Sequence, residues 1–168
     1  RFEAGRTRGD TPFTPAVETV QIMHRSLSMM RRAGFSAVAR RHARAAGAMS
    51  AAAERCSLRP YSECPSSAVQ VFRLPEGCRQ DEILARLERK GFVAAGGQDE
   101  LKGTVVRLGF LGLFDVETLV RLARALATSL GESGVMTDVP AAERCIRDGE
   151  IDAPAEGGSG EPFLGLGA

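Results

Sequence analysis

Residues 104–131 constrain the fold more than any other part of the sequence. A short strand rich in β-branched residues, 104–109, is followed at once by a helix that Asp115 is expected to cap. The apolar residues of this helix recur at helical spacing, at Val116, Leu119, Val120, Ala123, Leu126, Ala127 and Leu130. A strand followed by a short connection and an amphipathic helix is typical of folds that mix the two elements.

Strands and helices also alternate through the rest of the chain. Two helices are expected before the first strand, separated by Gly34, and the first of them begins at a Thr14-Pro15 start signal. A strand, a helix and a second, short strand follow at residues 68–74, 80–90 and 92–95. The sequence therefore predicts an α/β fold, with a mostly antiparallel sheet, helices on one face and two long helices in front of it.

Charge and composition exclude several classes of protein. The 168 residues carry 22 basic and 21 acidic side chains, which argues against binding nucleic acid by bulk electrostatics. No uncharged apolar run reaches the length of about 20 residues that a membrane helix needs. The four cysteines fit no metal-ligand spacing, and no other metal-ligating cluster is present. We expect unpaired thiols in a reducing compartment, which favours the cytoplasm and leaves peroxisomal or mitochondrial location open.

Arg107 is the first candidate for a binding residue. Because side chains alternate across a strand, Val106 and Leu108 are expected to face the helix that follows, and Arg107 the opposite side. A guanidinium in the middle of an apolar strand is suited to binding a carboxylate through two parallel hydrogen bonds. The alternatives are a solvated arginine and one paired with an acid such as Asp99 or Glu100.

Three other features are weaker candidates. The glycine pair at 96–97 allows a close approach of the backbone to a ligand, or forms an ordinary turn. Thr14 stands at a helix start, where anions including phosphate bind readily, although simple capping also explains it. His24 and His42 lack a partner at a diagnostic spacing and are expected to be packed or solvated.

Two of these segments resemble parts of a known enzyme family. The sequence TPFTPAV before a long helix, and AAGGQDELKGTVVRLGFLGLFDVETLVRLARAL, are similar to the class V aminotransferases, which are pyridoxal-phosphate enzymes of fold type I. The similarity is to the C-terminal part of the alanine–glyoxylate and serine–glyoxylate (serine–pyruvate) branch. It covers roughly residues 10–131 and is most specific at 95–115, whereas the C-terminal stretch matches nothing expected of the family.

The resemblance implies roles for two residues. The family arginine that holds the substrate carboxylate falls on Arg107, and the threonine that reaches the cofactor phosphate of the neighbouring subunit falls on Thr14. It implies pyridoxal 5'-phosphate as cofactor, amino-acid and oxo-acid substrates, and a homodimer in the complete enzyme. Family members often have a histidine or an aliphatic residue directly after the R-x-G motif, which ends here at Gly109. This chain has Phe110 at that position, which reshapes the wall beside the substrate.

Neither lysine of the chain matches the family's Schiff-base lysine, which belongs to an upstream large domain. Lys90 ends a helix and Lys102 lies in a turn before the arginine strand. The resemblance thus implies four segments. Residues 1–13 would be a truncated end of the large domain, and 14–55 a helical segment that joins the two domains. Residues 56–131 would form a small α/β substrate domain, and 132–168 an irregular, largely disordered tail.

The resemblance predicts the C-terminal portion of an aminotransferase that moves an amino group between alanine or serine and an oxo acid such as glyoxylate. Without the lysine, this portion is expected to be inactive alone, whether it is a fragment or a decayed copy. One alternative is a stand-alone binding or interaction module that lost catalysis. Another is a ferredoxin-like regulatory domain that binds amino acids, which the two helices before the first strand disfavour.

Overall fold

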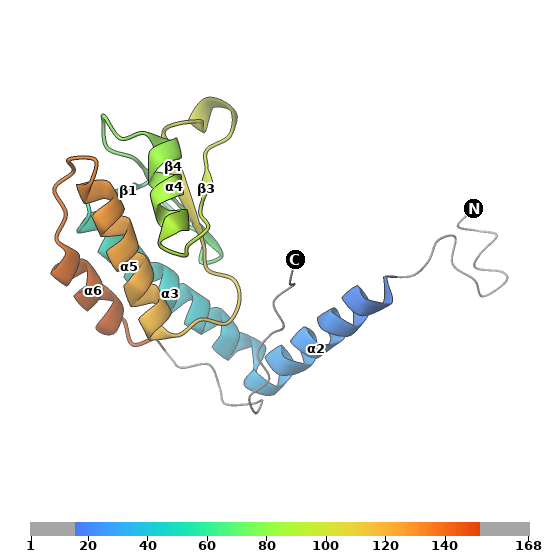
Figure 1. Cartoon of the computed structure of the whole chain (residues 1–168). Coiled ribbons are helices and arrows are strands. Elements are labelled where there is room, and N and C mark those ends of the chain that lie inside the picture. The colour runs from blue at the N-terminus through green and yellow to red at the C-terminus, as the bar shows by residue number, and fades with distance from the viewer. Residues whose placement is uncertain (1–15, 152–168) are drawn as a thin grey trace, which may run out of the picture. The chain divides into compact units, whose positions relative to one another are not determined.

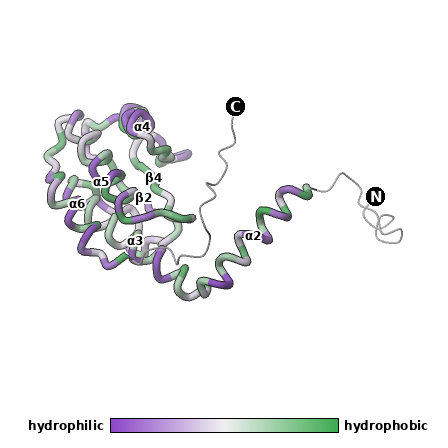
Figure 2. Tube along the Cα trace, turned by 60° about the horizontal axis from the view of Figure 1, so that its bottom comes forward, coloured by the Kyte–Doolittle hydropathy of each residue, from purple (hydrophilic) through white to green (hydrophobic). Residues whose placement is uncertain are grey.

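The computed structural model describes residues 16–151, which divide into two compact units. The first unit includes the helix α2 (Val17–Ala33), which ends at Gly34 with φ of 84° as the sequence predicts. None of the side chains of α2 is buried, and hydrophobic residues recur along it (Figure 2). No helix in residues 16–151 is long and apolar enough to cross a membrane.

The second unit contains all the strands and the remaining helices of the described residues (Figure 1). Its helices are α3 (Phe35–Glu54, of which Phe35 falls in the first unit), α4 (Gln80–Arg89), α5 (Val116–Gly131) and α6 (Val139–Arg147), with the 3-10 turn η1 (Asp99–Leu101). Its strands are β1 (Arg59–Pro60), β2 (Val69–Arg73), β3 (Ala95–Gly96) and β4 (Val105–Gly109). The α/β fold with two long helices before the sheet is confirmed.

The four strands form one antiparallel sheet in the order β1-β2-β4-β3. In the central pair, Phe72 lies opposite Val106 and Gln70 opposite Leu108, and all four side chains are buried. These residues share one face because side chains alternate along a strand. Helix α4 packs against β3, β4 and α5, so the helices cover this face. On the other face Val105 is fully buried beside Gly97, and the rest of that face is open.

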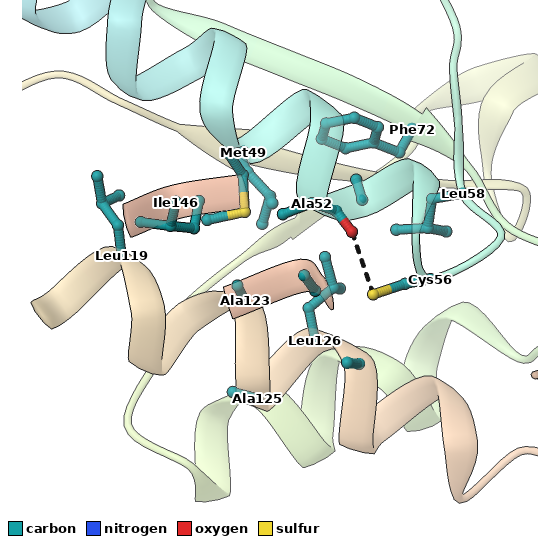
Figure 3. Packing of buried hydrophobic residues seen from close by; sticks show 14 of the residues in the cluster. Met49, Ala52, Cys56, Leu58, Phe72, Leu119, Ala123, Ala125, Leu126 and Ile146 are labelled. Carbon is teal, nitrogen blue, oxygen red and sulfur yellow. Dashed lines mark hydrogen bonds between the residues drawn. The ribbon is translucent and has the colours of Figure 1, made fainter. Parts of the chain in front are cut away.

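One hydrophobic core joins the sheet to the helices. Figure 3 shows Met49 and Ala52 of α3 with Leu126 of α5 and Ile146 of α6, all of them buried. Alanines supply much of the buried surface of α3, at positions 45, 46, 48, 52 and 53. Cys56 Sγ donates to the Ala52 carbonyl at 3.3 Å, and burial raises the pKa of this thiol to about 11. All four cysteines are free, as predicted.

The segment from residue 132, predicted to be irregular apart from short elements at 135–139 and in the stretch AAERCIRDG, contains a helix in its first part. Residues 139–147 form α6, whose start is capped by the Asp138 side chain accepting from Ala141 N at 2.9 Å. Ala142 and Ile146 of α6 are fully buried and pack with α5. The sequence underestimates this helix because it is short and lies among glycines, whereas its apolar face gains its stability from tertiary contacts. Residues 152–168 and 1–15 lie outside the described part of the chain.

Most of the other element boundaries agree with the sequence. The strand expected at 92–95 is shifted, because only Ala95 and Gly96 pair with β4. The predicted cap of α5 is confirmed, since Asp115 Oδ1 accepts from Thr118 N at 2.7 Å. Hydrogen bonds from the Thr118 side chain and from this backbone N–H favour the charged carboxylate and lower the pKa of Asp115.

The Asp115 cap predicts a pH-dependent contribution to stability. The folded pKa lies below the unfolded one, so the contribution is present above about pH 4 and is lost as pH falls through the folded pKa. Asp115→Ala is expected to lower the free energy of unfolding at neutral pH by about 1 kcal/mol, measured by urea denaturation. Asp115→Asn, which still caps, should retain most of the stability and lose the acid dependence. An equal loss in both variants at neutral pH would contradict this account of the cap.

Candidate functional site

Arg107 lies in the middle of the sheet, on the face that the helices leave open. Its neighbours across the sheet are Val71 of β2 and Ala95 of β3. Val106 and Leu108 on either side of it are buried in the core, while Arg107 is half-buried. The predicted alternation of β4 is therefore confirmed, and the guanidinium points away from the packed helices.

The side chain of Arg107 is oriented by the neighbouring strand. Its Nε donates to the Gly96 carbonyl at 2.7 Å, which ties β4 to the short edge strand β3. No carboxylate within residues 16–151 forms an ion pair with it, so the alternative pairing with Asp99 or Glu100 is absent from this part of the chain. The Nη groups are held by no described residue and are available for an anion.

The glycine pair beside Arg107 is explained by the packing of the chain itself. A Cβ on Gly97 would lie 1.9 Å from the Leu101 carbonyl oxygen, which no side chain could tolerate. Gln80 Oε1 accepts from the backbone N–H groups of Gly97 at 2.8 Å and of Gly103 at 3.1 Å. The pair thus forms a tight turn anchored to α4, and close approach to a ligand is not needed to account for it.

A clamp from α3 holds the loop that follows β4. Arg41, itself buried, donates from Nη2 to the Gly112 carbonyl at 3.1 Å. His42 Nε2 lies 3.3 Å from the Gly112 nitrogen, and its Nδ1 lies 2.8 Å from the Val38 carbonyl. With Nδ1 protonated, Nε2 accepts from the Gly112 N–H. The ring of Phe114 completes the clamp with an edge contact to His42 and a cation–π contact to Arg41.

The sequence misses the clamp because its partners lie 70 and 71 residues apart. His42 fits the expectation of a packed histidine, and His24 is exposed on α2. Neither carries a catalytic arrangement. Thr14, the other candidate, lies outside the described residues.

Arg107 lines neither of two grooves that are found among the described residues. The larger, of about 470 Å³, follows α5 and is lined by Lys90, Phe92, Arg121, Arg124, Ala125, Thr128 and Glu132. In it Lys90 Nζ pairs with Glu132 Oε1 at 2.9 Å, so this lysine is engaged in an ion pair. The smaller, of about 160 Å³, is mostly apolar and contacts Phe92, Phe110 and Phe114. The site around Arg107 is an open face, which a second surface would have to close.

Curated proteins similar to this chain include hydrogenase subunits and aminotransferases. The chain is 31% identical to the small subunit of a soluble hydrogenase from Synechococcus sp., over 84% of this chain and 38% of that protein. It is 30% identical to an uncharacterised aminotransferase of Methanocaldococcus jannaschii, over 74% of this chain and 35% of that protein. It is 27% identical to the serine–glyoxylate aminotransferase of Hyphomicrobium methylovorum, over 76% of this chain and 33% of that protein. No family model matches the chain.

Solved structures that share the fold of this chain include aminotransferases. The pyridoxamine–pyruvate aminotransferase of Mesorhizobium loti superimposes with a TM-score of 0.74 at 23% identity, covering 83% of this chain and 37% of that one. An aspartate aminotransferase of Thermus thermophilus gives 0.59 at 29% identity, covering 79% and 38%. The resemblance to the aminotransferases is thus confirmed. The chain spans little more than a third of the length of these relatives, which fits their C-terminal part.

The turn beside Arg107 predicts an asymmetry between two glycines. Gly97→Ala is expected to lower the free energy of unfolding by about 1–3 kcal/mol, because the added methyl meets the Leu101 carbonyl. Gly109→Ala, on the same open face with nothing within 4 Å, is the matched control and should change stability by less than about 1 kcal/mol. Denaturant titration of both variants measures the difference, and equal effects would contradict the packing role of Gly97.

Proposed function

Since the chain is related in sequence and fold to the C-terminal part of aminotransferases, we propose that it supplies the substrate-binding portion of such an enzyme. The complete enzyme would depend on pyridoxal 5'-phosphate. It would transfer an amino group between a small amino acid, alanine or serine, and an oxo acid such as glyoxylate. The role of this portion is to bind and orient the substrate.

The observation that supports the proposal most directly is the position of Arg107 and the contacts of its side chain. Its guanidinium is half-buried on an open sheet face, is fixed by one hydrogen bond to Gly96, and has no carboxylate partner in residues 16–151. A planar cation in this setting binds a carboxylate through two parallel hydrogen bonds. Fixing the carboxylate fixes the orientation of the neighbouring carbon, at which an amino acid reacts. Arg107 would therefore determine how the substrate lies.

The described residues do not by themselves fit the cofactor. A pyridoxal-phosphate enzyme needs a lysine amine for its carbonyl group. Lys90 is ion-paired to Glu132, and Lys102 lies in an exposed turn. We propose that the ring is held outside residues 16–151 and that Thr14 contacts the phosphate of a neighbouring subunit, in a homodimer. No catalytic step is therefore assigned to this part of the chain. The cytoplasm is our expected location.

The domain organisation is part of the same proposal. Residues 1–13 would belong to a large domain, 14–55 would join it to the small domain, and 56–131 would form the small domain. The buried face of α6 supports extending that last unit to include residues 139–147.

A non-catalytic binding or interaction module derived from this domain is the second candidate. Two relatives, from Synechococcus sp. and Anabaena cylindrica, are named as subunits of a soluble hydrogenase, a name that points to a role in a protein assembly and not to amino transfer. Sequencing the gene upstream of Arg1 separates the two candidates. The first requires an in-frame large domain with a lysine after a strand, and the second requires a start codon close by.

The role of Arg107 predicts a specific defect. In the full-length parent enzyme, Arg107→Ala should weaken oxo-acid binding by about ten- to a hundredfold, because a charge-assisted pair is lost, with the cofactor still bound. Steady-state kinetics with both substrates measures this, and the absorbance of the cofactor reports its occupancy. Arg121→Ala, at an exposed position on α5, is the control. Unchanged KM and rate for both substrates would refute the assignment.

The lysines predict the behaviour of the 168-residue chain by itself. Incubated with pyridoxal 5'-phosphate and then reduced with borohydride, it should show no stoichiometric attachment to one lysine by mass spectrometry, and no transaminase activity. Stoichiometric labelling of Lys90 or Lys102, together with amino transfer from alanine or serine to glyoxylate, would overturn this prediction.

A further inference from the structure

The open face of the sheet carries two arginines besides Arg107. Arg59 of β1 lies directly opposite Arg73 of β2, so their side chains leave the sheet on the same side. The face is the one that bears Arg107, because Val71, two residues before Arg73, lies opposite Arg107. Three neighbouring strands thus each contribute a guanidinium to one surface.

This arrangement costs stability unless an anion occupies it. Like charges directly opposite each other on antiparallel strands repel, whereas opposite charges at such positions stabilise the sheet. Within residues 16–151 neither Arg59 nor Arg73 forms an ion pair, and both are exposed. The face therefore concentrates positive charge that no described carboxylate neutralises.

Two features give this surface a defined shape. The guanidinium of Arg73 stacks over the ring of Tyr61, with its carbon 4.6 Å from the ring centroid. Tyr61 N donates to the Val71 carbonyl at 2.8 Å, so Tyr61 continues the register and shares the open face. Val71 lies between Tyr61 and Arg107 and is half-buried, which makes an apolar floor between the two cationic sites.

We propose that this face binds a dicarboxylate, with one carboxylate on Arg107, the second on Arg73 and Arg59, and the methylene chain over Val71. The proposal rests on the carboxylate-binding role of Arg107 given above and deepens it. It assigns a dicarboxylic oxo acid, in place of glyoxylate, as the amino acceptor of the complete enzyme, with alanine or serine as the amino donor.

The positions of the arginines favour two carboxylates on one ligand over a single one. Arg73 and Arg107 are diagonal neighbours on adjacent strands, with backbones about 7–8 Å apart. Their guanidiniums point in opposite directions. That of Arg73 lies over Tyr61, which follows β1, and that of Arg107 is bonded to Gly96 of β3. The two cationic sites are therefore separated by more than one carboxylate can bridge, and a short carbon chain fills the interval.

Titrations of the isotope-labelled 168-residue chain, followed by the side-chain Nε and Cζ NMR signals of its arginines, test the proposal. The probes are glutarate and its monomethyl ester, which has the same carbon chain and one carboxylate. Glutarate should shift the signals of Arg73 and Arg107 along one binding curve and bind about fivefold more tightly than the ester, the upper end of what an exposed ion pair contributes. Arg73→Gln should abolish this preference.

The controls separate the dicarboxylate site from the proposed carboxylate-binding role of Arg107. Arg89→Gln, an exposed arginine at the end of α4, should keep the preference, and the backbone amide spectrum of each variant checks its fold. Equal affinity for both probes, or a preference that survives Arg73→Gln, overturns the dicarboxylate site and leaves Arg107 in place if Arg107→Gln still weakens binding of the ester. An ester affinity unchanged by Arg107→Gln refutes the proposed function, and with it the dicarboxylate site.

Discussion

The pleat of β4 is the constraint on which the rest of this molecule depends. Because consecutive side chains leave a strand on opposite sides, burying Val106 and Leu108 in the core beneath the helices obliges Arg107 to face away from it. The same pleat, carried across the hydrogen-bonded register, brings Val71, Tyr61 and Arg73 to that side. Hydrophobic burial therefore does two things at once: it stabilises the helical layer, and it presents a charged surface to whatever closes the open face. A one-residue slip of β4 would exchange the two faces and remove both.

Local patterns were sufficient for much of this fold. The Asp115 cap and the apolar spacing of α5 are properties of one short segment, so the sequence alone predicts them. The facing of Arg107 is likewise local. The clamp of Arg41 and His42 on Gly112 depends on side chains that meet across 70 residues, and no periodicity reports such a meeting. The sequence indicates no more than a short element where α6 forms, for a related reason: the burial of this helix against α5 outweighs its weak intrinsic signal. The arginine pair on β1 and β2 is visible only once the register is known.

The relatives and the geometry bear on different parts of the function. Similarity over little more than a third of the relatives' length establishes the aminotransferase-like fold, whereas substrate recognition rests on particular side chains. The open sheet face explains why both considerations are needed. A guanidinium exposed on one side binds anions weakly in water, and it becomes selective when a second surface excludes the solvent around it. Substrate specificity would then be a property of the assembled enzyme, to which this chain contributes fixed cations.

The hydrogen bond from Arg107 Nε to the Gly96 carbonyl limits how a carboxylate can be held. A guanidinium offers two bidentate edges, one formed by Nε with an Nη and the other by the two Nη groups. The fold already uses the Nε–H to hold the edge strand, so the first edge is occupied and only the second remains. A carboxylate must approach along the axis of the side chain, in an end-on pair. The direction from which a substrate enters is thereby set by the contact that keeps β3 in the sheet.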